Sequence, residues 1–179
     1  MFLIGFMGSG KSWLSARISE RMDIPRYDLD EEIEREQGLS IGEFFREHGE
    51  AAFRKLEREA LERLCENILN RISIEGPIAH RPGAVVSTGG GTPCFGDNMD
   101  WMNRNGLTVW LNTPRELILA RLSRGRAHRP LIAGLDNEAL EAFVSEMLEA
   151  RKPHYAKARL EWTGGGHETA ELVKLLEHA

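Results

Sequence analysis

Short apolar runs alternate with longer segments of helical periodicity along this chain. The apolar runs at 1–4, 84–88, 107–111 and 160–163 have the length of buried strands. In the segments between them, apolar residues recur every three or four positions, as they do on helices that cover a sheet. The alternation favours a single α/β domain over residues 1–179, in which helices flank a central parallel sheet of about five strands in three layers.

Several residues mark where helices begin and end. Ser40 and Glu43 have the spacing of a capping box, and Gly49 is placed to end the short helix that they begin. Thr113 and Pro114 predict another helix start, with the threonine as the cap and the proline in the first helical position.

Glycine and proline punctuate the remaining connections. Residues 70–82 contain two Gly-Pro or Arg-Pro pairs and are expected to form an exposed connection after an amphipathic helix over 50–70. Three glycines at 164–166 predict a turn between the last strand and a final helix that ends near residue 176.

Composition narrows the class of protein. The 179 residues are 41% hydrophobic and 28% charged, which suits one domain with its own core. A formal net charge of −5 argues against a nucleic-acid partner. The two cysteines, Cys65 and Cys94, are too few for a disulfide framework. Because no apolar run is long enough to span a membrane and no signal pattern precedes the first strand, we expect a cytoplasmic monomer.

The strongest chemical signal lies at residues 5–12, between the first apolar run and the first helical segment. Glycines at 5, 8 and 10, followed by Lys11 and Ser12, have the spacing of a phosphate-binding loop, or P-loop. In such a loop the backbone N–H groups hold phosphates, the lysine reaches the β- and γ-phosphates, and the serine hydroxyl holds Mg²⁺. The pattern predicts a nucleoside triphosphate site. Trp13 lies two residues after the lysine. The pattern alone indicates that its side chain has an ordinary packing role.

Two aspartates and a run of glycines follow strands of the predicted sheet. Asp28 and Asp30, at the end of a short second strand, are as well suited to capping the next helix as to chemistry. A P-loop enzyme, however, needs a carboxylate near its Mg²⁺ and a group that orients the nucleophile, and these aspartates are the candidates. The glycines at 89–91 end another strand, at the edge where open parallel sheets bind ligands, although a plain turn is a serious alternative.

A basic loop occupies residues 123–135 of an otherwise acidic chain. Arg124, Arg126 and Arg129 lie in it, together with two glycines. It is either a solvated charge run, a small nucleic-acid arm, or a mobile lid that brings arginine to the transferring phosphoryl group, and we prefer the lid. Periodicity alone makes Arg54, in the helix over 50–70, a surface residue.

Six motifs together resemble the shikimate kinases, in the same order and with matching spacing from Gly5 to at least Tyr155. They are Gly-Phe-Met-Gly-Ser-Gly-Lys-Ser at 5–12, Asp-Leu-Asp at 28–30, Gly-Glu-Ala-Ala-Phe-Arg at 49–54, Gly-Gly-Gly at 89–91, Arg-Pro-Leu-Ile at 129–132 and Arg-Lys-Pro-His-Tyr at 151–155. The resemblance implies a P-loop fold of the nucleoside monophosphate kinase type. It also implies an enzyme that uses ATP to phosphorylate the 3-hydroxyl of shikimate, on the route to chorismate and the aromatic amino acids.

The resemblance assigns a nucleotide site to the first part of the chain. Lys11 and Arg129 would contact the ATP phosphates, and Ser12 and Asp28 would serve Mg²⁺ directly or through water. The rest of the nucleotide site would be the loop and the residue that stands where such loops usually carry threonine: Gly8, Ser9, Gly10 and Trp13.

The resemblance also assigns a substrate site, within a region at about 28–60 and on two later segments. Asp30 would orient the substrate hydroxyl, while Arg54, Arg151 and the backbone at Gly90 would hold shikimate. Two forked guanidinium groups suit a small carboxylate substrate.

Two other functions stay open on the sequence. A related kinase for another acid or polyol, such as gluconate, would keep the P-loop and the lid, and the pair of Arg54 with Arg151 distinguishes it. A kinase-like regulatory module would bind ligands without turnover, but it would have no reason to keep Lys11, Asp30 and Arg129 together.

Overall fold

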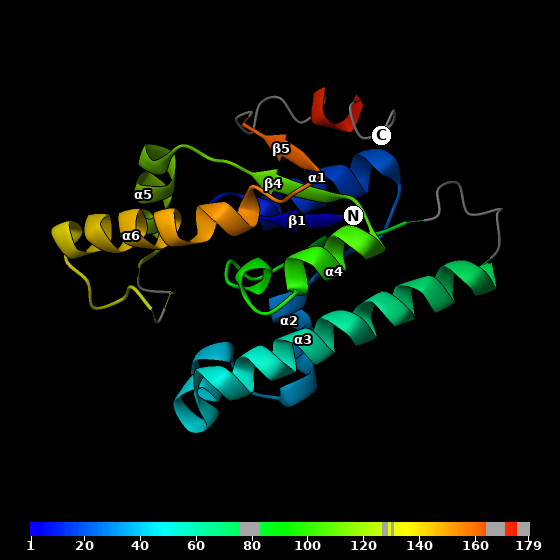
Figure 1. Ribbon diagram of the computed structural model, residues 1–179, viewed down its shortest axis with the longest axis horizontal. Helices are drawn as coiled ribbons and strands as arrows, with labels where there is room; N and C mark the ends of the chain where they lie inside the picture. Colours follow the sequence, from blue (N-terminus) through cyan, green and yellow to red (C-terminus); the bar gives the residue numbers. More distant parts are fainter. Residues whose placement is uncertain (76–82, 127–128, 130, 164–170, 175–179) are drawn as a thin grey trace.

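Five parallel strands form the centre of the molecule, with helices on both sides (Figure 1). The computed structural model describes residues 1–75, 83–126, 129, 131–163 and 171–174. The strand order is β2-β3-β1-β4-β5. The strands are β1 (Phe2–Ile4), β2 (Arg26–Asp28), β3 (Val85–Ser87), β4 (Thr108–Leu111) and β5 (Leu160–Trp162). The predicted three-layer α/β fold is therefore confirmed.

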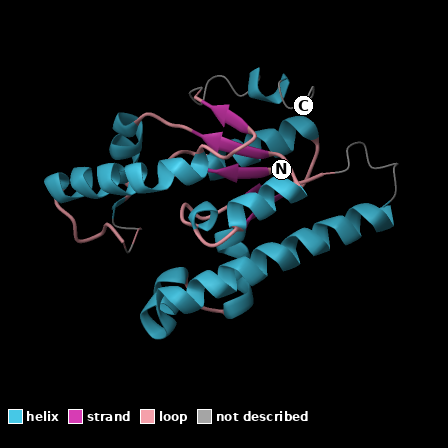
Figure 2. Cartoon of the chain, in the orientation of Figure 1, coloured by secondary structure: helices cyan, strands magenta, loops and turns pink. Residues whose placement is uncertain are grey.

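Helices connect successive strands and make up most of the chain (Figure 2). They are α1 (Lys11–Met22), α2 (Leu29–Gln37), α3 (Ile41–Glu75), α4 (Asn98–Asn105), α5 (Arg115–Arg124) and α6 (Asn137–Tyr155), with a short 3₁₀ turn η1 (Thr92–Cys94). Helix α4 was not predicted from the sequence. None of the helices in the described part of the chain is long and apolar enough to cross a membrane.

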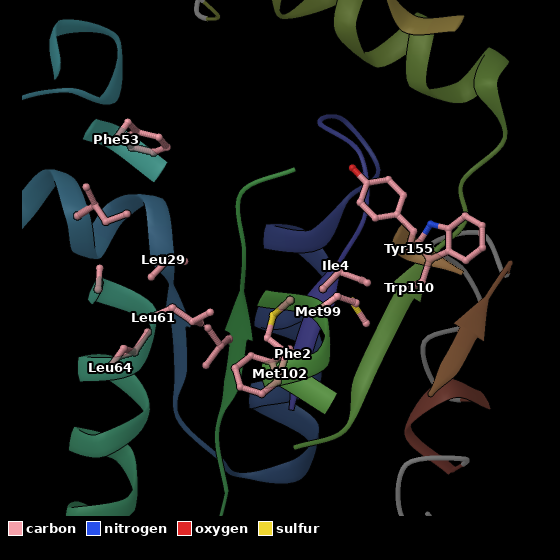
Figure 3. Close-up of a cluster of buried hydrophobic side chains, with 13 residues drawn as sticks. Phe2, Ile4, Leu29, Phe53, Leu61, Leu64, Met99, Met102, Trp110 and Tyr155 are labelled. Atoms are coloured by element: carbon pink, nitrogen blue, oxygen red, sulfur yellow. The ribbon is translucent and has the colours of Figure 1, made fainter. Parts of the chain in front are cut away.

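Successive residues of each central strand face opposite layers. Phe2 and Ile4 of β1 belong to the cluster that packs against α2, α3 and α4, part of which is shown in Figure 3. Leu3, between them, packs with Leu14 and Ile18 of α1 on the other face. Both faces of the three central strands are buried, so β1, β3 and β4 are buried throughout and appear as short apolar runs, whereas the edge strands β2 and β5 include exposed charged residues.

A third cluster fixes the P-loop to the helices that follow β4. Phe6, inside the loop, is 1% exposed and packs with Ile118 and Leu122 of α5. Ile132 and Val144 belong to the same cluster and are fully buried. Residue 132 lies in the predicted lid, so this segment is anchored by an apolar side chain at its C-terminal half.

The capping box and the break at Gly49 are confirmed, but the following helix is longer than predicted. The Ser40 N–H donates to Glu43 Oε2 at 2.8 Å, and the Glu43 N–H donates to Ser40 Oγ at 3.2 Å. Gly49 has φ 78° and ψ 172°, which divides α3 into two helices. The second continues to Glu75, so the start of the expected connection at 70–82 is helical. Residues 76–82 lie outside the described residues.

The predicted role of Thr113 as a helix cap is wrong. Helix α5 begins at Arg115 with Pro114 as its cap, and no side chain caps it. The Thr113 hydroxyl instead donates to the Ser9 carbonyl at 3.0 Å. This tertiary hydrogen bond stabilises the P-loop. Pro114, with φ −51° and ψ 138°, is itself the cap of α5, so its predicted place in the first helical position is also wrong. Residues 171–174 are helical as predicted, whereas the glycines at 164–166 lie outside the described residues.

Candidate active site

The P-loop leaves β1 at Gly5 and turns back to meet the N-terminus of α1. Gly5, Gly8 and Gly10 have φ of 143°, 79° and 103°, a region that side chains with Cβ rarely adopt. A Cβ at Gly5 would also lie 2.9 Å from the Leu111 carbonyl oxygen. The loop therefore requires glycine for its conformation and its packing, and it aims the N–H groups of the first turn of α1 into the loop.

Lys11 folds its side chain back over the P-loop. Its Nζ donates to the carbonyls of Gly5 at 2.8 Å and Phe6 at 3.0 Å. Burial lowers the pKa of Lys11 to about 8, against the opposing effect of the Asp30 and Asp28 carboxylates. A buried ammonium with two neutral carbonyl partners is incompletely stabilised, so an anion in the loop would improve its surroundings.

Ser12 and Asp28 bring two oxygen atoms together below the loop. The Ser12 hydroxyl donates to Asp28 Oδ2 at 3.1 Å, and Asp28 Oδ1 accepts from the Asp30 N–H at 3.1 Å. Asp28 is thus both the cap of α2 and a neighbour of the P-loop serine, so the two readings of this residue are compatible. A hydroxyl and a carboxylate are oxygen ligands of the kind that Mg²⁺ prefers.

These two residues do not make a complete metal site by themselves. Among the described residues there is no group of three or more histidine, cysteine, aspartate or glutamate side chains arranged to hold a metal ion.

Asp30 carries the most perturbed carboxyl group of the site. Burial raises the pKa of Asp30 to about 7, the charges of Asp28 and Glu57 add to the increase, and Lys11 opposes it. A carboxyl group with its pKa near neutrality can accept a proton and still release it, which suits a group that works beside a reacting hydroxyl.

The glycines at 89–91 bring the other predicted site residues together. A Cβ at Gly89 would lie 2.9 Å from Asp30 Oδ1, and one at Gly90 would lie 3.1 Å from Arg151 Nη1. At Gly91 a Cβ would lie 2.5 Å from Arg54 Nη2. Side chains from α2, α3 and α6 therefore converge on this glycine run, and a larger residue at any of the three positions would force them apart.

Glu57 is the main site residue that the sequence did not reveal. Its side chain is 1% exposed and accepts hydrogen bonds from Arg54 Nη1 at 2.8 Å and from Thr92 Oγ1 at 2.6 Å. Burial works to lower the pKa of Arg54, but the charges and hydrogen bonds of Glu57 and Glu50 together outweigh burial, and the pKa rises. Arg54 is therefore not the surface residue that periodicity indicates. The signal that was available is the spacing of three residues, which puts Glu57 on the same helix face as Arg54.

Tyr155 fixes the glycine run from the opposite side. Its hydroxyl donates to the Gly90 carbonyl at 2.6 Å, while its ring is buried and packs against Trp110 (Figure 3). Burial raises the pKa of Tyr155, so it remains a hydrogen-bond donor. Arg151 lies one turn earlier on α6, with its guanidinium 5.4 Å from the centre of the Phe6 ring. One helix thus positions both the glycine backbone and an arginine of the site.

A cleft of about 1180 Å³ runs along the P-loop. Its lining includes most of the predicted nucleotide residues together with Asp30, Gly90 and Arg129. Arg54 and Arg151 do not contribute to this lining, because the first is held by Glu57 and the second lies against Gly90 and Phe6. Trp13 is 46% exposed on the cleft, so its interpretation as ordinary packing is wrong.

Comparison with known proteins identifies the family. A family model described as shikimate kinase matches residues 7–177. The chain belongs to the shikimate kinase family. Among its relatives, shikimate kinase from Bacteroides thetaiotaomicron is 38% identical over 159 residues, which cover 89% of this chain and 83% of that protein. Shikimate kinase from Aquifex aeolicus is 35% identical over 174 residues, which cover 97% and 91%.

Solved structures of shikimate kinases share the fold. The crystal structure from Bacteroides thetaiotaomicron superposes with a TM-score of 0.84 and 35% identity, covering 99% of this chain and 95% of that one. Shikimate kinase from Acinetobacter baumannii in complex with shikimate gives a TM-score of 0.80 and 29% identity, covering 99% and 89%. The resemblance inferred from the six motifs is therefore confirmed.

Proposed function

We propose that this chain catalyses the reaction for which its family is named, the transfer of the γ-phosphoryl group of ATP to the 3-hydroxyl of shikimate. The products are shikimate 3-phosphate and ADP. Family membership supports this proposal, as does the solved relative in complex with shikimate. The observation that carries it is the convergence of Asp30, Arg54 and Arg151 on the glycine run beside the P-loop.

The P-loop would hold the ATP phosphates. Lys11 exchanges the carbonyls of Gly5 and Phe6 for the β- and γ-phosphates, which stabilise its buried charge better. Ser12 and Asp28 would hold Mg²⁺ directly or through water. When bound, the ion would neutralise charge on the phosphates. Arg129 reaches the transferring group from the lid, the segment at 123–135.

Asp30 and the two arginines would hold shikimate. Arg54 and Arg151 fork its carboxylate, and the Gly90 backbone contributes a further contact. In the reaction a bond forms between the 3-hydroxyl oxygen and the γ-phosphorus, and the bond from that phosphorus to the bridging oxygen of ADP breaks. Asp30 orients the hydroxyl and accepts its proton, which the raised pKa favours.

Every proposed role falls on one chain, so the enzyme would act as a monomer. Both reactants are small, so it would need no nucleic-acid or membrane partner. We place it in the cytoplasm. The acidic net charge of −5 supports the absence of a nucleic-acid partner. Size-exclusion chromatography with light scattering checks the monomer, and a mass of twice that of one chain would overturn it.

A coupled assay of ADP release tests the function directly. Shikimate, quinate, gluconate and nucleoside monophosphates are compared in parallel, each with wild type and with Lys11→Ala. We expect turnover with shikimate, reduced at least about a hundredfold in kcat by the substitution. Preference for gluconate would favour the alternative kinase, and ADP binding without turnover of any acceptor would favour a regulatory module.

A further inference from the structure

The side of α1 that lines the cleft carries an aromatic side chain, Trp13. It directly follows the P-loop serine, where a contact with phosphate would be expected. Trp13, Arg17 and Arg21 are spaced by four residues, so they form one stripe along the helix, and all three line the cleft. Leu14 and Ile18 take the buried side of the same helix. Nearly half of the Trp13 surface stays exposed, 46%, in a position next to the P-loop serine.

Arg17 holds the indole of Trp13 in place. Its guanidinium carbon lies 5.1 Å from the centre of the ring, a distance at which a cation is attracted to an aromatic face. The lining of the cleft also includes Leu117 and Arg121 of α5 and Trp162 of β5. The exposed remainder of the indole therefore opens on a space bounded by apolar and planar groups.

The chemistry of the indole indicates which part of a nucleotide it would contact. Its face carries negative electrostatic potential and it has a single N–H donor, so it is a poor partner for phosphate and a good one for a flat, apolar ring. Lys11, two residues earlier, faces the P-loop where the phosphates belong. The base of the same nucleotide must lie farther along the cleft, away from that lysine.

We propose that Trp13 is a wall of the nucleobase site, on which the purine of ATP packs while Arg17 holds the indole from its other side. This assignment deepens the proposed function, because it requires the nucleotide to occupy the P-loop cleft. It makes Trp13 a determinant of nucleotide affinity rather than of phosphoryl transfer. A residue that binds the base equally in the ground state and the transition state changes the KM for ATP and leaves kcat unaltered.

Calorimetric titration with two ligands separates the base from the phosphates. ADP carries both, and inorganic tripolyphosphate carries only phosphates. For Trp13→Ala we expect ADP binding to weaken about five- to a hundredfold, the range found when an aromatic platform under a base is removed, while tripolyphosphate binding changes less than about twofold. Trp13→Phe, which keeps an aromatic face, should retain most of the ADP affinity.

Trp101 provides the matched control. It also lies under an arginine, with the Arg58 guanidinium carbon 5.1 Å from the ring centre, but it does not line the cleft. Because Trp162 also lines the cleft, the fluorescence arm uses a Trp162→Phe background. In that background, addition of ADP should change the tryptophan fluorescence of the parent and of Trp101→Phe, and this change should be much smaller in Trp13→Phe. The two Phe variants preserve ring packing, so the fluorescence arm decides even if Trp13→Ala fails to fold.

Two results would overturn the proposal. One is equal ADP affinity in wild type and Trp13→Ala. The other is a parallel loss of ADP and tripolyphosphate affinity, which would mean that Trp13 merely supports the P-loop. Because neither titration needs shikimate, failure of this proposal is distinguishable from failure to phosphorylate shikimate.

Discussion

Arg54 Nη1 and Glu57 Oε2 lie 2.8 Å apart across one turn of α3, and the Glu57 side chain is 1% exposed. The other oxygen of Glu57 accepts from Thr92 Oγ1, just beyond the glycine run. One buried carboxylate therefore positions the arginine that we assign to the substrate and the backbone segment beside it. Its charge also contributes to the raised pKa of Asp30, which links substrate positioning to the proton chemistry.

Replacement of Glu57 by glutamine should change both properties. Arg54 loses its buried charged partner and keeps Glu50, which is 69% exposed, so kcat/KM for shikimate should fall about tenfold at pH 8. With one negative charge fewer, the pKa of Asp30 decreases, and the acid limb of the pH profile of kcat/KM should move to lower pH by roughly half to one unit. Glu62→Gln is the control, because Glu62 pairs with Arg58 on the same helix but is 42% exposed. An unmoved acid limb would disconnect Glu57 from Asp30.

Asp30→Asn should stabilise the ligand-free protein at alkaline pH while removing activity. The pKa of Asp30 is raised in the folded state to about 7, so its contribution to stability is full below the unfolded pKa and is lost as pH rises through 7. Asparagine does not ionise. The quantity to compare is the unfolding free energy of the variant minus that of wild type. We expect this difference to be about 1–3 kcal/mol more favourable to the variant at pH 8 than at pH 4. Urea denaturation at both pH values measures this, with Asp100→Asn as an exposed control, and a pH-independent difference would contradict it.

The arginine fork should depend on geometry as well as on charge. Arg54→Lys and Arg151→Lys keep the charge but lose the planar pair of donors, so each should reduce kcat/KM for shikimate about ten- to a hundredfold. The KM for ATP should hardly change. The double variant should lose less than the product of the two single effects, because both groups serve one carboxylate. Full activity of both single variants would remove the fork and reopen the gluconate-type alternative.

Arg129 should act mainly in the transition state. Arg129 lines the cleft, while its Nη1 lies 3.4 Å from the Gly125 carbonyl of its own segment. If closure of the lid delivers it to the transferring phosphoryl group, Arg129→Ala should lower kcat by about a hundredfold or more and leave the KM for ATP nearly unchanged. Arg124→Ala, in the same segment, serves as the control. An effect limited to the KM for ATP would make Arg129 a simple binding residue.

Tyr155→Phe should loosen the glycine run. The lost hydroxyl leaves the Gly90 carbonyl without its 2.6 Å hydrogen bond, so the unfolding free energy should fall by about 1 kcal/mol. The KM for shikimate should rise several-fold, with a smaller effect on kcat, because we assign Gly90 to the substrate and not to the phosphoryl group. Tyr27→Phe, on β2, is the control. Steady-state kinetics that match wild type would show that Gly90 is held by its other neighbours.

The P-loop and the strand pattern were predictable because local features encode them. Gly5, Gly8 and Gly10 are required by backbone conformation, and Lys11 and Ser12 follow at fixed positions on the adjoining helix. The strands were found because a parallel sheet is apolar on both faces. The extra turns of α3 to Glu75 and the whole of α4 were missed. In α4 the buried apolar residues are Met99 and Met102, too short a stripe to distinguish a helix from a loop in the sequence.

The sequence by itself determined the fold class, the phosphate-binding loop and, through its six motifs, the family. It also named candidate residues for the site, although Arg54 acquired a role only by resemblance and Glu57 was missed. The tertiary structure decided how those residues are held. Glu57 pairs with Arg54, and Tyr155 donates to the Gly90 carbonyl. Thr113 donates a hydrogen bond to the P-loop and does not cap a helix. The contacts of Tyr155 and Thr113 join residues 65 and 104 positions apart, so they depend on how the elements pack around the sheet, whereas Glu57 pairs with Arg54 within one helix. Hydrophobic periodicity reports which face is buried, but the partner of a buried polar group is fixed only when the layers pack together.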